Sequence, residues 1–127
     1  MIAEVLKKIE EAKDLVNTKL ESGNYSESEC LARLDELNYI NNIIIEISKE
    51  YCDSEEMIKI ITEEIIKRLG ENKDIKRFRL NYGYYPMYET IVRVEEIEKI
   101  IDKVFVVADK LFTNDEERRI IREYLQF

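Results

Sequence analysis

The fold depends on how the chain passes through residues 47–58, which read ISKEYCDSEEMI. An apolar seam at heptad spacing continues through this stretch without a slip. Its positions are Ile44, Ile47, Tyr51, Ser54, Ile58, Ile61 and Ile65. One reading is therefore a single coiled-coil-like helix over residues 27–69, about 65 Å long at 1.5 Å per residue. The other reading is a break near Asp53, because Asp-Ser-Glu-Glu is typical of a helix N-cap with an acidic first turn. We favour the break, which lets the chain fold on itself as a bundle.

Amphipathic helices are predicted before this stretch. A first helix over residues 2–21 has apolar side chains at alternating spacings of three and four. They are Ile2, Val5, Ile9, Ala12 and Val16. Gly23 is expected to end this helix in the left-handed region of the backbone. Ser26 and Glu29 form a capping box, which predicts a second helix that runs to about Cys52.

Further helices are predicted after the break. A third helix over residues 54–69 would end at Gly70. A fourth is clear from Val94 onward, and its start can lie as early as Met87 because proline suits a first helical turn. It is the most apolar helix, so we expect it at the centre of the bundle. A last helix is predicted from a cap at residues 113–116 to Gln126.

Residues 71–88 follow a different pattern. The stretch from Phe78 to Tyr84 alternates apolar and polar side chains, which is the period of a strand. It also contains the only proline of the chain. We favour an extended crossover that lies across the bundle, and a small hairpin or a short helix are the alternatives. A lone two-stranded hairpin is marginally stable unless another element covers it.

These elements predict an all-α fold. We expect an antiparallel bundle of four to five helices in one domain of residues 1–127, with a non-helical, aromatic-rich crossover at about 71–88. The long coiled-coil-like helix over residues 27–69 is the alternative architecture. No internal repeat is evident in the pattern.

The composition fits one globular domain. The 127 residues are 45% hydrophobic and 38% charged, and the net charge of -8 opposes general binding to phosphate backbones. No apolar run approaches the roughly 20 residues that span a bilayer, and the start has no secretory-signal pattern. We therefore expect a cytoplasmic protein without membrane association. The abundance of Ile, Glu and Lys resembles the composition of heat-adapted proteins.

The residue types argue against several kinds of catalysis. The chain has no histidine, which is the commonest general base and a common metal ligand. Glu63, Glu64 and Glu98 are the candidate metal ligands, but we interpret them as charges on solvated helix faces. Cys30 and Cys52 lack metal-site or redox spacing and are expected to form no disulfide. The sequence thus predicts a protein that is not an enzyme and that holds no cofactor or metal.

One basic and aromatic segment stands out as a candidate binding surface. Lys73 and Lys76 precede a run of cations and aromatic rings, from which we select six candidate partner-binding residues. They are Arg77, Phe78, Arg79, Tyr82, Tyr84 and Tyr85. Tyrosine and arginine are enriched at protein hot spots, and the same mixture suits single-stranded nucleic acid. The alternative is that the aromatics plug the end of the bundle while the cations pair with acidic helices.

The second helix carries a candidate self-association face. It comprises Leu37, Ile40, Asn41, Ile44 and Ile47, and an asparagine in such a seam can fix the register of a coiled coil. We expect a non-catalytic interaction or assembly module that forms a homodimer or is a subunit of a larger assembly. A nucleic-acid-associated protein that uses residues 73–88 is the alternative.

Overall fold

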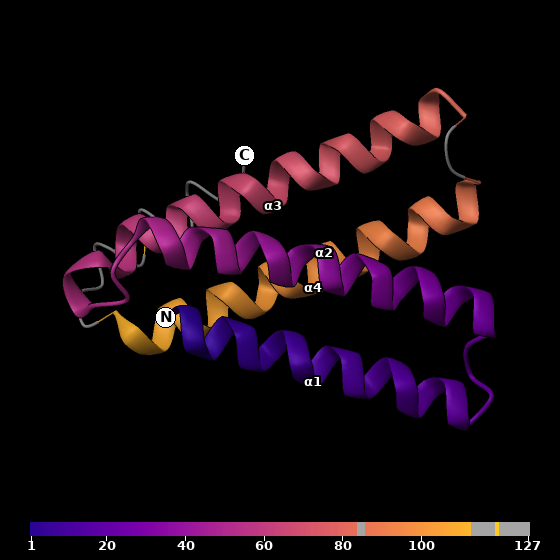
Figure 1. Ribbon diagram of the computed structural model, residues 1–127, viewed down its shortest axis with the longest axis horizontal. Helices are drawn as coiled ribbons and strands as arrows, with labels where there is room; N and C mark the ends of the chain where they lie inside the picture. The colour runs from indigo at the N-terminus through magenta and orange to yellow at the C-terminus, as the bar shows by residue number, and fades with distance from the viewer. Residues whose placement is uncertain (84–85, 113–118, 120–127) are drawn as a thin grey trace.

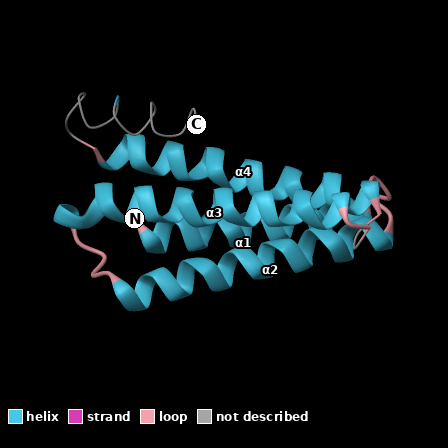
Figure 2. Cartoon of the chain, turned by 90° about the horizontal axis from the view of Figure 1, so that it is seen from above, coloured by secondary structure: helices cyan, strands magenta, loops and turns pink. Residues whose placement is uncertain are grey.

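The computed structural model describes residues 1–83, 86–112 and 119. Within them the chain forms α1 (Ile2–Glu21), α2 (Glu27–Glu50), a short 3-10 helix η1 (Glu55–Met57), α3 (Ile58–Asn81) and α4 (Met87–Leu111), and these residues include no strand. The long helices alternate in direction, with their connections at the two ends of the bundle (Figures 1 and 2). The predicted all-α antiparallel bundle is confirmed. The helix predicted to end at Gln126 lies outside the described residues except for Arg119.

The break near Asp53 is confirmed, because α2 ends at Glu50 and η1 starts at Glu55. Asp53 nevertheless does not cap the helix that follows it. Its carboxylate accepts hydrogen bonds from the backbone N–H groups of Ile2 at 3.3 Å and Ala3 at 3.5 Å. A carboxylate at a helix N-terminus is favourable because the unpaired N–H groups there carry partial positive charge. These hydrogen bonds therefore link the connection between α2 and α3 to the start of α1.

The non-helical crossover predicted for residues 71–88 is wrong for residues 71–81 and 87–88, which are helical, and the helix end predicted at Gly70 is wrong as well. α3 runs through Gly70 to Asn81. Its buried face continues at helical spacing with Leu69, Asn72 and Lys76. Asn72 and Lys76 are polar, so the spacing of apolar residues does not indicate that the helix continues past Gly70. The alternation of apolar and polar side chains from Phe78 onward is typical of a strand, although residues 78–81 are helical.

The glycines in the two hairpin turns have positive φ angles, +74° at Gly23 and +75° at Gly83. Gly23 thus ends α1 as predicted, and Gly83 takes the corresponding role after α3. The capping box is confirmed in part. Ser26 Oγ accepts the Glu29 N–H at 3.1 Å, whereas the carboxylate of Glu29 turns to other partners, as described below.

Helices α2 and α4 form the centre of the bundle. Each packs against the other and against both α1 and α3, which confirms the central position predicted for α4. The core side chains that α2 contributes include Leu37, Ile40, Ile44 and Ile47, each 0% exposed. This corrects the predicted self-association face, because these four residues are covered within one chain. Asn41 is half-buried at the edge of the core.

The chain contains an internal repeat that sequence patterning missed. Residues 1–50 and 61–110 align without gaps when their numbers differ by 60. The identical pairs are Glu4 and Glu64, Lys7 and Lys67, Glu11 and Glu71, Lys13 and Lys73, Asp14 and Asp74, Leu20 and Leu80, Gly23 and Gly83, Tyr25 and Tyr85, Glu29 and Glu89, Arg33 and Arg93, Glu36 and Glu96, and Ile40 and Ile100. Eight of the twelve pairs are charged residues, so they add little to a hydrophobic pattern.

The same repeat is present in the structure. Buried positions of α2 recur on α4 at the same offset. These pairs are Cys30 and Thr90, Ala32 and Val92, Arg33 and Arg93, Glu36 and Glu96, Leu37 and Ile97, Ile40 and Ile100, Ile44 and Val104, and Ile47 and Val107. The bundle is therefore two helical hairpins, α1–α2 and α3–α4, and their inner helices α2 and α4 run in the same direction (Figure 1). The α2–α3 contact corresponds to the α4–α1 contact, as in a pseudo-two-fold arrangement.

Two glycine substitutions test the continuity of α3. A Cβ added at Gly70 meets no atom within 4 Å, so Gly70→Ala is expected to raise the free energy of unfolding by about 0.5–1 kcal/mol through helix propensity. Gly83→Ala is expected to lower it by about 1–2 kcal/mol, because the left-handed conformation is strained for alanine. Urea denaturation measures both values. A destabilising Gly70→Ala would contradict a helix that continues through this residue.

Candidate functional site

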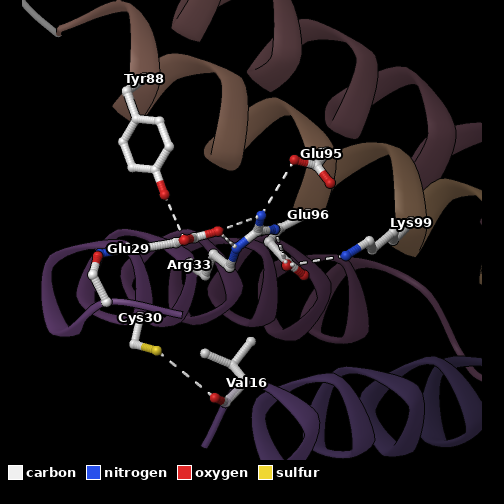
Figure 3. A network of polar contacts seen from close by, with 9 residues as sticks. Val16, Glu29, Cys30, Arg33, Tyr88, Glu95, Glu96 and Lys99 are labelled. Carbon is white, nitrogen blue, oxygen red and sulfur yellow. Dashed lines mark hydrogen bonds and ion pairs between the residues drawn. The ribbon is translucent and has the colours of Figure 1, made fainter. Parts of the chain in front are cut away.

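A buried arginine joins α2 to α4 near the hairpin turns. Arg33 is 3% exposed. Its Nε and Nη2 donate to Glu29 Oε1 at 3.1 and 2.8 Å, on its own helix. Across the interface, Nη1 donates to Glu96 Oε1 at 2.7 Å and Nη2 to Glu95 Oε2 at 3.2 Å (Figure 3). Every nitrogen of this guanidinium therefore has a carboxylate partner, as a buried charge requires.

In the second repeat Arg93 makes the equivalent contacts, and they run from α4 to α2. Arg93 Nε and Nη2 donate to Glu89 Oε1 at 3.1 and 3.0 Å. Its Nη1 donates to Asp35 Oδ2 at 2.8 Å and to Glu36 Oε1 at 3.4 Å, across the interface. Each inner helix thus gives one arginine to the carboxylates of the other. We call Arg33, Arg93 and these carboxylates the arginine cluster.

The contacts of the cluster shift the proton affinities of its members. Burial lowers the pKa of Arg33, but hydrogen bonds to Glu29 and Glu96 raise it more, so the net pKa lies above its usual value. Burial raises the pKa of Glu29, but hydrogen bonds from Tyr88 and Arg33 bring the net pKa below its usual value of 4.5. The Tyr88 hydroxyl donates to Glu29 Oε2 (Figure 3). Glu29 is therefore held as a carboxylate near neutral pH.

Sequence reasoning missed this cluster. The signal that identifies it is the spacing Glu-x-x-x-Arg-x-x-Glu, which occurs at residues 29–36 and again at 89–96. At that spacing the three side chains lie on one helix face.

The two halves of the bundle differ beside the cluster. Glu36 Oε2 accepts a hydrogen bond from Asn72 Nδ2 at 2.8 Å, and Lys76 Nζ lies 3.7 Å from Glu36 Oε1. The corresponding residues in the first repeat are Ala12 and Val16, which carry no polar group on their side chains. At that place a cavity of about 530 Å³ lies between α1 and α4, with Glu96 in its wall.

The predicted partner-binding residues gather at the end of α3. Arg77, Phe78 and Arg79 are exposed on its last turns, and Tyr82 follows in the turn. The rings of Phe78 and Tyr82 lie 4.4 Å apart between centroids. Tyr84 and Tyr85 lie outside the described residues.

The start of α4 adds exposed apolar side chains to the same end of the hairpin. They are Met87, Tyr88 and Ile91. Together with Phe78 and Tyr82 they form what we call the tip patch. All five side chains are more than half exposed, so the alternative that the aromatics plug the bundle does not hold for Phe78 and Tyr82.

The basic side chains of the segment are partly neutralised. Lys76 is only 3% exposed and its ammonium lies 4.2 Å from the ring centre of Tyr39, as well as near Glu36. Lys73 Nζ and Arg77 Nη2 both face Glu98 Oε1, at 3.9 and 3.7 Å. The segment therefore presents a weaker positive field than its composition suggested.

Two of the three metal candidates of the sequence, Glu64 and Glu98, have other partners. Glu64 Oε1 accepts from Arg68 Nε at 2.7 Å, and Glu98 faces the two cations named above. Within residues 1–83, 86–112 and 119, no group of three or more Asp, Glu, Cys or His side chains is arranged to hold a metal ion. Cys30 and Cys52 are free thiols. Cys30 is buried, which raises the pKa of its thiol, and its Sγ lies 3.8 Å from the Val16 carbonyl oxygen.

None of the helices in the described part of the chain has the length and apolarity that a membrane crossing requires. No known protein family, curated protein or solved structure matches the chain.

Substitution of Arg33 tests the arginine cluster. Arg33→Met is expected to lower the free energy of unfolding by about 3–5 kcal/mol, because it leaves buried carboxylates without their cation. The control is Arg77→Met, whose side chain is 55% exposed and faces Glu98, and which is expected to change stability by less than about 1 kcal/mol. Urea denaturation at pH 7 compares them. Equal effects of the two substitutions would show that the cluster does not stabilise the fold.

Acid titration tests the role of Glu29. A carboxyl group whose folded pKa is depressed stabilises the fold above its unfolded pKa, and this contribution is lost as the pH falls through the folded pKa. The wild-type protein is therefore expected to lose stability below about pH 4.5, and Glu29→Gln is expected to reduce the slope of that loss. The exposed Glu27 provides the control substitution Glu27→Gln. Thermal melts between pH 3 and 7 measure the slopes, and identical slopes in all three proteins would refute the role of Glu29.

Proposed function

We propose that this chain is a non-catalytic protein-binding module and that the tip patch is its contact surface. The supporting observation comes from the internal repeat. The residues equivalent to Phe78, Tyr82, Met87 and Tyr88 are all polar and exposed in the first hairpin. They are Thr18, Ser22, Glu27 and Ser28. The fifth member of the patch, Ile91, corresponds to Leu31, which is also apolar and exposed. Because the same backbone tolerates polar side chains at the other four places, the fold does not require aromatic or apolar ones there in the second hairpin.

The described part of the patch is pre-organised for binding. Phe78 lies on regular helix, and the Tyr82 N–H donates to the Phe78 carbonyl at 3.2 Å. Gly83 donates to the Leu80 carbonyl at 3.0 Å, and the Tyr88 hydroxyl is held by Glu29. Side chains that are already ordered lose less entropy on association, so more of the contact energy is available for affinity.

The charges around the patch favour one type of occupant. Arg77 and Arg79 remain exposed beside Phe78 in a chain of net charge -8. A second copy that docked patch to patch about a two-fold axis would bring like charges together. We therefore propose a different protein, with an apolar contact segment bordered by Asp or Glu side chains. Such acids can compete with Glu98 for Arg77, since an exposed ion pair contributes little.

Nucleic acid is the weaker candidate for the same surface. A strand that binds by stacking needs cations that follow its phosphates. Here Lys76 is buried against Glu36, and Lys73 and Arg77 share one glutamate. This arrangement favours a protein partner over a nucleic-acid strand.

The experiment starts from affinity purification out of the native cell and ends with a purified pair. The protein retained by the wild-type chain is produced separately, and its Kd is measured by calorimetry. The double variant Phe78→Ser and Tyr82→Ser is expected to weaken binding at least tenfold, because it removes two central aromatic contacts. The control places the changes on the opposite hairpin, as Thr18→Ala and Ser22→Ala, and is expected to bind as the wild type does.

Two results would overturn this proposal. One is a partner whose affinity is the same for both double variants. The other is salt-dependent binding of a single-stranded oligonucleotide that disappears in the Phe78→Ser and Tyr82→Ser variant, which would assign the patch to nucleic acid. Sedimentation distinguishes the remaining occupant, since a dimer that dissociates in the same variant would identify a second copy of the chain.

A further inference from the structure

We propose that the cavity between α1 and α4 binds the ammonium group of a primary alkylamine, with Glu96 as its carboxylate partner. The volume of about 530 Å³ lies within the range of small-molecule sites, roughly 300–1,000 Å³. Its apolar lining consists of Ala12, Leu15, Val16, Ile100 and Val106, of which Leu15 and Val106 are about half exposed, and the charged residues of the lining besides Glu96 are Lys8, Glu11, Lys99, Asp102 and Lys103. Glu96 lies at the inner side of this lining and is 2% exposed.

The second repeat shows what this space accepts. There the equivalent carboxylate, Glu36, meets the ammonium of Lys76 at 3.7 Å and the amide of Asn72 at 2.8 Å. The four-carbon side chain of Lys76 is 3% exposed, so its chain and its charge are both enclosed. Lys76 is in effect a butylammonium group covalently held in the equivalent site.

The first repeat has the same carboxylate without that occupant. Ala12 and Val16 stand where Asn72 and Lys76 stand in the second repeat, and both line the cavity. Glu96 Oε1 accepts from Arg33 Nη1 at 2.7 Å on the side of the cluster. Lys99 Nζ lies 3.6 Å from the same oxygen, on the other side of the carboxylate (Figure 3).

Lys99 does not take the place of Lys76. It belongs to α4 itself, three residues after Glu96, and its side chain is 45% exposed against 4% for Lys76. Lys99 therefore lies at the rim, and the space between Val16 and the half-exposed Leu15 is left to a ligand. A ligand ammonium can displace Lys99 from Glu96, because the lysine side chain is 45% exposed and its ammonium is hydrated when it is released.

The chemistry of the walls selects the class of ligand. A primary ammonium has three donors for a buried carboxylate, and an alkyl chain of about four carbons fits the apolar walls. A quaternary ammonium has no N–H donor, and the ring of Tyr25 is already covered by the Arg33 guanidinium at 4.6 Å. An anionic ligand could pair with Lys8, Lys99 or Lys103, but it would also have to approach the buried charge of Glu96.

A titration with n-butylamine hydrochloride at pH 7 tests the site. In nitrogen-15 correlation spectra of the whole chain, saturable shifts are expected at residues along α1 and α4 that line the cavity. The isosteric alcohol n-butanol is expected to bind at least tenfold more weakly. Nα-acetyl-lysine methylamide forms a second arm. If it binds as n-butylamine does, the natural ligand can be a lysine side chain of a protein. If only n-butylamine binds, a free amine is indicated.

Two pairs of variants use the repeat as an internal control. Ala12→Asn with Val16→Lys copies the second repeat into the first, and it is expected to fold and to lose n-butylamine binding at least tenfold. Asn72→Ala with Lys76→Val does the reverse, and it is expected to gain a second site beside Glu36. If the first pair does not fold, the second pair still decides the question through the stoichiometry.

Three results would overturn the assignment: no saturable shift at millimolar n-butylamine, equal binding of n-butylamine and n-butanol, or unchanged binding after cavity filling together with no second site after cavity opening. The tip-patch variant Phe78→Ser and Tyr82→Ser is expected to bind n-butylamine normally, so the outcome does not depend on the proposed protein-binding function.

Discussion

The reciprocal contacts between two buried arginines and the carboxylates of the opposite inner helix hold the two hairpins in register. Arg33 reaches Glu96 on α4, and Arg93 reaches Asp35 and Glu36 on α2. Burying a guanidinium costs several kcal/mol in lost hydration unless carboxylates replace the water. A slip of either helix would leave charges unpaired in the interior, whereas leucine and isoleucine side chains would tolerate other registers. The apolar core supplies most of the stabilisation, and the arginine cluster selects one arrangement of it.

The repeat explains why this cluster can work in both directions. Each hairpin carries Glu, Arg and Glu at the same spacing, so each inner helix both offers a cation and receives one. The same reciprocity occurs in two-fold symmetric dimers, where one surface patch meets its own copy. Here both copies lie in one chain, so a substitution in one copy leaves the sequence of the other unchanged. The differences between the halves are accordingly where function is expected, at the tip patch and at the cavity beside Glu96.

These two places differ in kind. At the tip patch the second hairpin has gained aromatic and apolar side chains that the scaffold does not need, since Thr18 and Ser22 serve the first hairpin equally well. At the cavity the first hairpin lacks the side chains that complete the polar contacts of the second. One half thus offers an exposed apolar surface and the other an internal space. Comparing a chain with its own repeat separates what the fold requires from what it merely permits.

The sequence by itself determined the helical class, the break near Asp53, the ends of α1 and the central position of α4. The helical class, the ends of α1 and the apolarity of α4 depend on residues within a few positions of one another, through helical periodicity or a left-handed glycine. Asp53 lies at the break, although it does not cap the helix that follows. The sequence also indicated Phe78 and Tyr82 as candidate partner-binding residues, because aromatic side chains beside cations are conspicuous in any chain. Only the tertiary structure decided that Leu37, Ile40, Ile44 and Ile47 are covered within one chain, that Asn72 and Lys76 continue the buried face of α3, and that a cavity lies beside Glu96. Burial and empty volume depend on which side chains meet from helices far apart in the chain, and local patterns do not contain that information.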